Sequence, residues 1–158
     1  MHTEASKDHQ WLRQLLGDWR YETDSAAEPG TPPDRHQGTE RVRELGPLWV
    51  LCEGQGDMPG GGIAQTLMTL GSAGEGKFVG SWIGSMMTHL WRYEGTLDAA
   101  RKVLTLSAEG PDFDHPGRTR RYRDVIEILA PDHRTLSAFM QCDDGTWRQF
   151  MIAHYWRV

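Results

Sequence analysis

The 158-residue sequence contains no apolar run that approaches the ~18 residues needed to cross a bilayer as a helix. Its first ten residues include Glu4, Lys7 and Asp8 and have no apolar core, so they do not resemble a secretory signal peptide. We therefore expect a cytoplasmic protein that makes no use of a membrane.

Positive charge is also scarce. The 17 lysines and arginines, of which three are lysines, stand against 22 acidic residues, and the formal net charge is −5. A protein that binds nucleic acid or an anionic membrane surface usually presents a strongly basic face. The composition thus argues against both as partners.

Cysteine is limited to Cys52 and Cys142, which lie far apart in the sequence. A secreted domain held together by disulfides would carry more cysteines than this. Two free thiols in a reducing compartment are therefore expected.

Glycine and tryptophan are abundant, with 18 and 7 residues, a combination typical of sheets with sharp turns and large side chains. One helix is predicted, over residues 5–16. Ser6 can cap its N-terminus, and Trp11, Leu12, Leu15 and Leu16 fall on one helical face. Gly17 is expected to end it.

After Gly17 the pattern changes to short runs separated by glycine, proline or aspartate, as in hairpins. About ten strands are predicted, at residues 19–24, 36–45, 48–56, 63–70, 77–84, 89–97, 103–109, 120–129, 134–142 and 147–157. Residues 143–145 and 97–100 predict tight turns, and residues 25–35, rich in proline, predict the one long mobile loop.

Strands joined in order by short turns form an antiparallel meander, and closing it into a barrel buries one face and removes the exposed edges. The sequence therefore predicts an all-β fold: a single antiparallel up-and-down barrel of about ten strands over residues 18–157, with the short N-terminal helix capping one open end. The whole chain, 1–158, is expected to be one domain. A β-sandwich is the alternative.

Several runs resemble an uncharacterised bacterial family known as domain of unknown function 1579 (DUF1579), and the similarity covers nearly the whole chain. They are residues 16–20 (LGDWR), 48–50 (LWV), 53–62 (EGQGDMPGGG), 66–71 (TLMTLG), 80–91 (GSWIGSMMTHLW), 121–127 (RYRDVIE) and 150–155 (FMIAHY). The resemblance implies a calycin-like barrel, similar to lipocalins, fatty-acid-binding proteins and nitrobindin-type haem barrels. Residues 72–76 depart from the family pattern, which has an aromatic residue and an Asp-Pro turn there.

Common catalytic and metal-binding motifs are missing. No Cys-x-x-Cys, His-Glu-x-x-His or His-x-His spacing suggests a metal site, and no Gly-x-Ser-x-Gly serine nucleophile occurs. The glycine run at 60–62 lies between two predicted strands, which favours a hairpin loop over a phosphate cradle.

The segment 82–93 concentrates large and polarisable side chains. Met86 and Met87 fall at a predicted turn, and His89, Trp91 and Tyr93 share one strand face by period-2 alternation. That aromatic face suits a barrel lumen, although ordinary core packing is an equally simple interpretation. Gly80 and Gly84 flank Trp82 on its own face and would leave room for its ring.

In the predicted strand 120–129, Arg121, Arg123 and Glu127 share one face, whereas Tyr122, Asp124, Ile126 and Ile128 share the other. Asp124 therefore points to apolar surroundings, where a carboxyl group needs a partner or its pKa rises. Arg20, Arg41 or His154 could supply the opposite charge.

The last strand places Phe150, Ile152, His154 and Trp156 on one face. We expect this face to be inward, which would put both His89 and His154 in the lumen. By analogy with nitrobindin-type barrels, His154 could then ligate haem. The opposite face, with Met151, Ala153 and Tyr155, is nearly as apolar, and if it is the inner one, His154 lies outside at a dimer contact.

The leading functional hypothesis is a barrel that binds a small, partly apolar molecule in its lumen, with no resident cofactor or metal expected. The predicted ligand-binding residues are Trp49, Glu53, Trp82, Met86, Met87, His89, Trp91, Arg123, Asp124 and His154. Two alternatives remain: an enzyme that uses His89 or His154 with Glu53 or Asp124 as general acid and base, and a haem barrel. A homodimer is the default oligomer.

Overall fold

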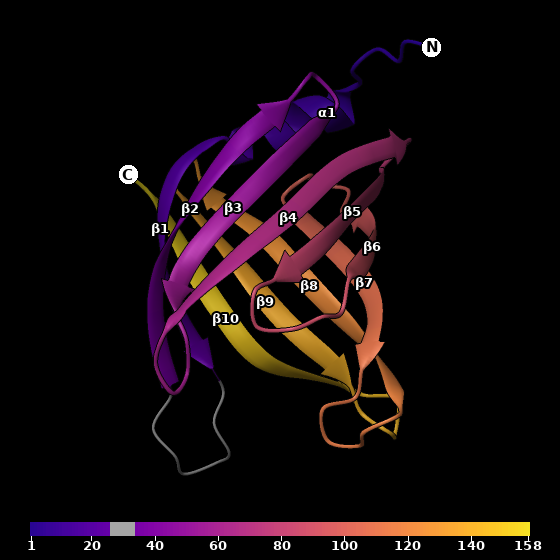
Figure 1. The fold of residues 1–158 in the computed structure, drawn as a ribbon. Coiled ribbons are helices and arrows are strands. Elements are labelled where there is room, and N and C mark those ends of the chain that lie inside the picture. Colours follow the sequence, from indigo (N-terminus) through magenta and orange to yellow (C-terminus); the bar gives the residue numbers. More distant parts are fainter. Residues whose placement is uncertain (26–33) are drawn as a thin grey trace.

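A computed structural model describes residues 1–25 and 34–158. Within these residues, ten strands form one closed antiparallel barrel (Figure 1). In chain order they are β1 (Gly17–Ser25), β2 (Asp34–Leu45), β3 (Trp49–Asp57), β4 (Ile63–Gly74), β5 (Lys77–Gly84), β6 (Trp91–Leu97), β7 (Val103–Pro111), β8 (Thr119–Ala130), β9 (His133–Gln141) and β10 (Trp147–Arg157). Most of the predicted loop at 25–35 falls outside the described residues.

Each strand pairs with its neighbours in the sequence, and β1 closes the barrel by pairing with β10 from Trp19 opposite Arg157 to Ser25 opposite Met151. The up-and-down barrel predicted from the hairpin spacing is therefore confirmed, and the sandwich alternative is wrong. The predicted bounds of β5 and β10 coincide with the observed ones. The other strands differ by one to four residues at their ends, of which the start of β6 at Trp91 matters most for the site.

The turns also follow the predicted chemistry. Gly60, Gly61 and Gly62 all have positive φ, and the Met58 N–H bonds to the Gly62 carbonyl, so this run is a hairpin loop between two strands. Gly145 has φ 86° in the tight turn between β9 and β10. Cys52 is buried, Cys142 is half-buried, and both are free thiols as expected.

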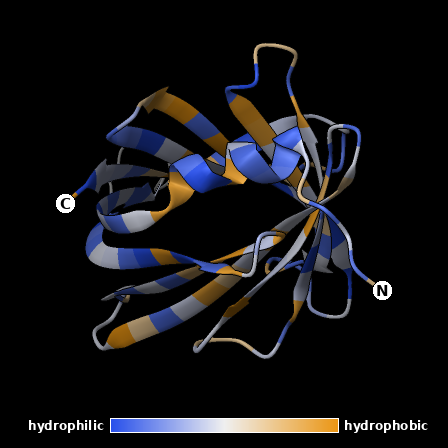
Figure 2. Cartoon of the chain, turned by 90° about the horizontal axis from the view of Figure 1, so that it is seen from above, coloured by the Kyte–Doolittle hydropathy of each residue, from blue (hydrophilic) through white to orange (hydrophobic). Residues whose placement is uncertain are grey.

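The predicted helix is confirmed but shorter, with α1 at Lys7–Leu12 followed by the 3₁₀ turn η1 at Arg13–Leu15. Ser6 caps α1 and forms a reciprocal capping box with His9. The helix lies across one end of the barrel (Figure 2), where Trp11, Leu12 and Leu15 are buried in the core. No helix in the described ranges is both long and apolar enough to cross a membrane.

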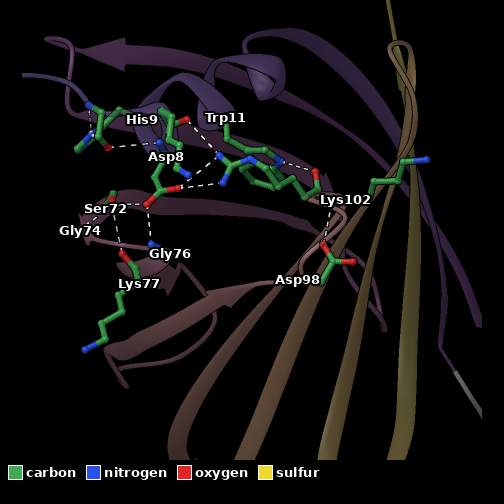
Figure 3. Close-up of polar contacts among 12 residues, drawn as sticks. Asp8, His9, Trp11, Ser72, Gly74, Gly76, Lys77, Asp98 and Lys102 are labelled. Atoms are coloured by element: carbon green, nitrogen blue, oxygen red, sulfur yellow. Dashed lines mark hydrogen bonds and ion pairs between the residues drawn. The ribbon is translucent and has the colours of Figure 1, made fainter.

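Polar contacts attach α1 to two hairpin turns of the barrel (Figure 3). The buried Asp8 carboxylate accepts from the Gly76 N–H at 2.8 Å and from the Arg101 guanidinium at 3.3 Å. The Trp11 indole N–H donates to the Arg101 carbonyl at 2.7 Å. The turn at 72–76, where the sequence departs from the family pattern, is thus held by the helix.

We expect Asp8→Ala to lower the free energy of unfolding by about 2–3 kcal/mol, because it removes a buried acceptor of charge-assisted hydrogen bonds. Chemical denaturation measures the loss. Asp18→Ala is the matched control, since Asp18 pairs with Arg41 at 3.0 Å on the exposed surface and such pairs contribute roughly 0–1 kcal/mol. Equal losses in the two variants would mean that the Asp8 contacts do not secure the helix.

Candidate functional site

The barrel encloses a cavity of about 310 Å³, within the usual range for small-molecule pockets of ~300–1,000 Å³. Its wall is mostly apolar, and Leu15 of η1 contributes to it. The cavity is also lined by Met87 and Phe113 from connections between strands, and by the strand residues Tyr21, Thr23, Glu40, Cys52, Thr66, Met68, Trp82, Trp91, Tyr93, Ala108, Tyr122, Asp124, Ile126, Arg134, Leu136, Ala138, Phe150, Met151, Ala153 and Tyr155.

One part of the wall is an aromatic cluster. Trp91 and Phe150 both pack edge-on against Tyr122, with ring centroids 5.0 and 6.3 Å away. The Trp91 indole N–H also donates to the Met87 sulfur at 3.1 Å. These edge-to-face contacts fix the rings in place, so the cluster presents a preformed apolar surface to the cavity.

Asp124 is a carboxyl group in this mostly apolar wall. Burial is the main cause that raises its pKa from an ordinary value near 3.8 to about 6, and a hydrogen bond from the Tyr93 hydroxyl partly opposes the rise. The inward position expected from the sequence is observed, and the carboxyl group has both a neutral partner, the Tyr93 hydroxyl, and a raised pKa. None of the three suggested charged partners pairs with it: Arg20 lies over Trp156, Arg41 pairs with Asp18, and His154 stacks on Trp156 outside the barrel.

The raised pKa of Asp124 makes stability depend on pH. A carboxyl group that binds its proton more tightly in the folded state does not lower the free energy of unfolding at pH values below its unfolded pKa, because it is protonated in both states. As pH rises from about 3.8 to about 6, the free energy of unfolding falls, and above about pH 6 the full loss is reached. The difference corresponds to at most ~3 kcal/mol.

We therefore expect Asp124→Asn to be more stable than the parent by about 1–3 kcal/mol at pH 8 and equally stable near pH 4. Asparagine keeps an acceptor for the Tyr93 hydroxyl. Denaturant midpoints across this pH range provide the measurement, and Glu127→Gln on the exposed face of the same strand is the control. A gain that is independent of pH would contradict the assignment.

A buried ion pair is the second polar feature of the cavity. Arg134 of β9 and Glu40 of β2 lie 2.6 Å apart with side chains only 4% and 12% exposed. The Arg134 guanidinium also lies over the rings of Tyr155 at 4.0 Å and Trp19 at 4.6 Å. Sequence analysis missed both residues, although Arg134 shares its strand parity with Leu136 and Ala138, which also face the cavity.

Of the ten predicted ligand-binding residues, the structure brings four together on the cavity wall: Trp82, Met87, Trp91 and Asp124. Trp82 is half-buried, and Gly84 leaves room for its ring, since a Cβ at Gly84 would lie 2.5 Å from the Trp82 ring. The other six lie elsewhere: Trp49, Glu53, Met86, His89, Arg123 and His154.

Trp49, Glu53 and Arg123 are on the outer surface of the strands that carry them. In β3, Val50 and Cys52 are buried, which turns Trp49 and Glu53 outward; Glu53 accepts from the Arg43 guanidinium at 3.1 Å. Arg123 lies on the outer face of β8 with its guanidinium 3.9 Å from the Trp147 ring. Met86 lies in the turn after β5 and is 40% exposed.

His89 precedes β6, so the strand alternation that was used to place it in the lumen does not extend to it. Its Nε2 lies 3.2 Å from the Glu109 carbonyl, and its ring packs edge-on against Trp91 with centroids 4.7 Å apart. His89 is therefore behind the aromatic cluster and not on the cavity surface.

His154 is on the outer face of β10. A bulge between Gln149 and Met151 shifts the alternation, so that Met151, Ala153 and Tyr155 line the cavity. His154 instead stacks on Trp156, and its Nδ1 lies 3.0 Å from Nε2 of His133. The prediction that both histidines face the lumen is wrong.

All seven histidines belong to the described part of the chain, and none lines the cavity. The residues present therefore do not fit a haem held in the cavity by His154. They also do not place an imidazole beside Asp124, and Glu53, the other carboxylate considered, is outside. The two alternatives that depended on a lumenal histidine lose their geometric basis.

Comparison with known proteins gives one family and several similar folds. The profile of a family described as "Protein of unknown function (DUF1579)" matches residues 4–157. No curated protein sequence matches the chain. Among solved structures, Rv2717c from M. tuberculosis is similar with a TM-score of 0.68 at 14% identity, covering 98% of this chain and 99% of that one.

Two further structures share the fold. The S-type phycobiliprotein lyase CPES from Guillardia theta has a TM-score of 0.61 at 12% identity, with coverage of 99% and 98% of the two chains. EF1p2_mFAP2b, bound to DFHBI, has a TM-score of 0.52 at 11% identity, with coverage of 95% and 98%. At these identities the similarity concerns the barrel fold alone.

Proposed function

We propose that this chain, which belongs to the DUF1579 family of proteins of unknown function, binds a small, partly apolar molecule in its barrel cavity. The observation that carries the proposal is the cavity itself: about 310 Å³, mostly apolar, with a few polar groups at fixed positions. Such a combination is the usual form of a small-molecule site.

The wall supplies the two kinds of contact that such a ligand needs. Trp82, Met87 and Phe150 offer apolar area to the body of the ligand. The Tyr93–Asp124 pair and the Glu40–Arg134 pair offer hydrogen bonds at separate places on the wall. A ligand donor that reaches Asp124 would bond to a carboxylate above pH 6 and would bind in one orientation.

Two proteins with similar folds bear on this proposal, one through its bound ligand and one through its name. EF1p2_mFAP2b has DFHBI bound, and CPES is a phycobiliprotein lyase. Neither ligand nor activity transfers to this chain by fold alone. What the DFHBI complex adds is one example of a barrel with a similar fold that holds a small molecule.

Titration with N-phenyl-1-naphthylamine, an uncharged dye that fluoresces in apolar surroundings, tests the proposal. We expect saturable binding with one dye per chain. Ala138→Trp, which places a large ring inside the cavity, is expected to abolish binding, whereas Ser137→Trp on the opposite face of β9 is expected to leave it unchanged.

Thermal melting of the two tryptophan variants checks that each is folded. If Ala138→Trp does not fold, Ala138→Leu places a smaller side chain in the cavity and replaces it in the test. Dye binding that is absent from the parent, or that survives equally in the Ala138 and Ser137 variants, would contradict binding in the cavity.

A further inference from the structure

The barrel wall is incompletely paired between β6 and β7. These strands pair only from Glu94 opposite Ser107 to Leu97 opposite Leu104. Residues 91–93 of β6 pair with β5, and residues 108–110 of β7 pair with β8, but the two segments do not pair with each other. The wall therefore has a gap three residues long on each side.

Side chains, not backbone bonds, fill this gap. The Trp91 ring covers Gly110 so closely that a Cβ there would lie 2.2 Å from the ring. His89 lies against Trp91, and its Nε2–H donates to the Glu109 carbonyl at 3.2 Å. Because His89 precedes the strand, this contact can open without breaking a strand pairing.

A groove of about 850 Å³ lies on the outer side of the gap. It is lined by His89, Leu90 and the outward-facing side chains of β6, β7 and β8, and it ends at Trp147 of β10. Ala108 and Tyr122 line both this groove and the cavity. The gap thus lies at the place where the groove and the cavity adjoin.

The groove and the cavity differ in charge. Arg92, Arg121 and Arg123 line the groove together with Glu94 and Glu109, which gives it one net positive charge. Inside, the cavity has the Glu40 and Asp124 carboxyl groups against a single guanidinium from Arg134. An anionic group on a ligand would therefore be favoured in the groove and disfavoured in the cavity.

We propose that the gap between β6 and β7 is a lateral opening, and that the ligand is an amphiphilic anion whose apolar body lies in the cavity and whose carboxylate or sulfonate lies in the outer groove beside Arg92 and Arg123. This inference rests on the proposed function, because it assigns an orientation to the ligand of the same cavity. His89, which lies against the fixed Trp91 ring, closes the opening when no ligand passes.

Two dyes that differ by one sulfonate test the charge assignment. The anion 1-anilinonaphthalene-8-sulfonate is expected to bind the parent more tightly than the uncharged N-phenyl-1-naphthylamine. In Arg92→Gln/Arg123→Gln the anion is expected to bind about tenfold more weakly, and the uncharged dye with unchanged affinity.

Arg20→Gln/Arg41→Gln is the matched control, since it removes the same charge from the outer faces of β1 and β2. If the two double substitutions weaken binding of the anion equally, or if neither weakens it, the groove does not hold the anionic group. That result leaves binding of the uncharged dye, and so the proposed function, intact. Failure of the parent to bind either dye would overturn both proposals.

The proposed entry route between β6 and β7 is tested by the association and dissociation rates of the dyes. His89→Ala removes the contact across the gap, and stopped-flow mixing is expected to show faster association and faster dissociation of both dyes with similar affinity. His133→Ala, on the outer face of β9 away from the gap, is expected to leave both rates unchanged. Parent-like rates in His89→Ala would contradict entry between β6 and β7.

Discussion

Arg134→Met is expected to lower the free energy of unfolding by about 3–5 kcal/mol, the usual cost of leaving one member of a buried ion pair without its partner. Glu40 lies 2.6 Å from Arg134 and has little exposure of its own. Methionine retains much of the apolar contact that Arg134 makes with Trp19 and Tyr155, so the loss reports on charge more than on packing.

A double variant separates these two contributions. In Glu40→Met/Arg134→Met no unpaired charge remains, and replacement of a buried pair by apolar residues is often neutral or stabilising. We therefore expect the double variant to recover most of the stability in denaturant titrations. If it is as unstable as Arg134→Met alone, the guanidinium stabilises the barrel through its contacts with the rings and not through Glu40.

An exposed pair offers the comparison. Arg43 and Glu53 lie 3.1 Å apart on the outer surface, with side chains 50% and 45% exposed. Arg43→Met is expected to cost roughly 0–1 kcal/mol, because water screens the pair and solvates the remaining charge. The difference between the stability losses of Arg134→Met and Arg43→Met therefore measures how burial changes the effect of removing one member of an ion pair.

The sequence predicted the barrel because its strands are short, alternating and separated by turn residues. β8 is the clearest case, with Tyr122, Asp124 and Ile126 inward and Arg121 and Arg123 outward as the alternation required. Strand parity is robust there because one face is charged. The inward position of the Asp124 carboxyl group followed directly, whereas the choice between a partner and a raised pKa did not.

β10 could not be oriented from sequence because its two faces are almost equally apolar. The bulge at Gln149–Met151 then shifts the phase, so Phe150 and Met151 both line the cavity. A bulge depends on backbone geometry that pairing with β9 imposes, and no residue in the run marks it. His154 was consequently placed inside when it lies outside.

The Glu40–Arg134 pair was missed for a different reason. Charged residues in strands usually face solvent, so neither residue stood out as a candidate for the cavity. The two residues are 94 positions apart, and only the closed barrel brings them together. Parity with Leu136 and Ala138 was a usable indication for Arg134, since those residues also face inward.

Trp19→Ala is expected to destabilise the protein by about 3–5 kcal/mol, the typical cost of truncating a buried tryptophan. Trp19 is 2% exposed, and its indole N–H donates to the Leu15 carbonyl at 2.8 Å. The guanidinium groups of Arg134 and Arg157 lie 4.6 and 4.2 Å from its ring. Truncation therefore removes apolar packing, a hydrogen bond and two cation–π contacts together.

Two other tryptophans calibrate this loss in the same denaturant titrations. Trp82→Ala is expected to cost less than Trp19→Ala, because the Trp82 ring is half-buried and already borders open volume, so its removal enlarges a cavity that exists. Trp156→Ala on the outer face of β10 should cost least, since its ring is covered mainly by Arg20 and the two histidines. Equal losses at Trp19 and Trp156 would mean that the buried contacts of Trp19, including its hydrogen bond to Leu15 of η1, add nothing to stability beyond those of an outer ring.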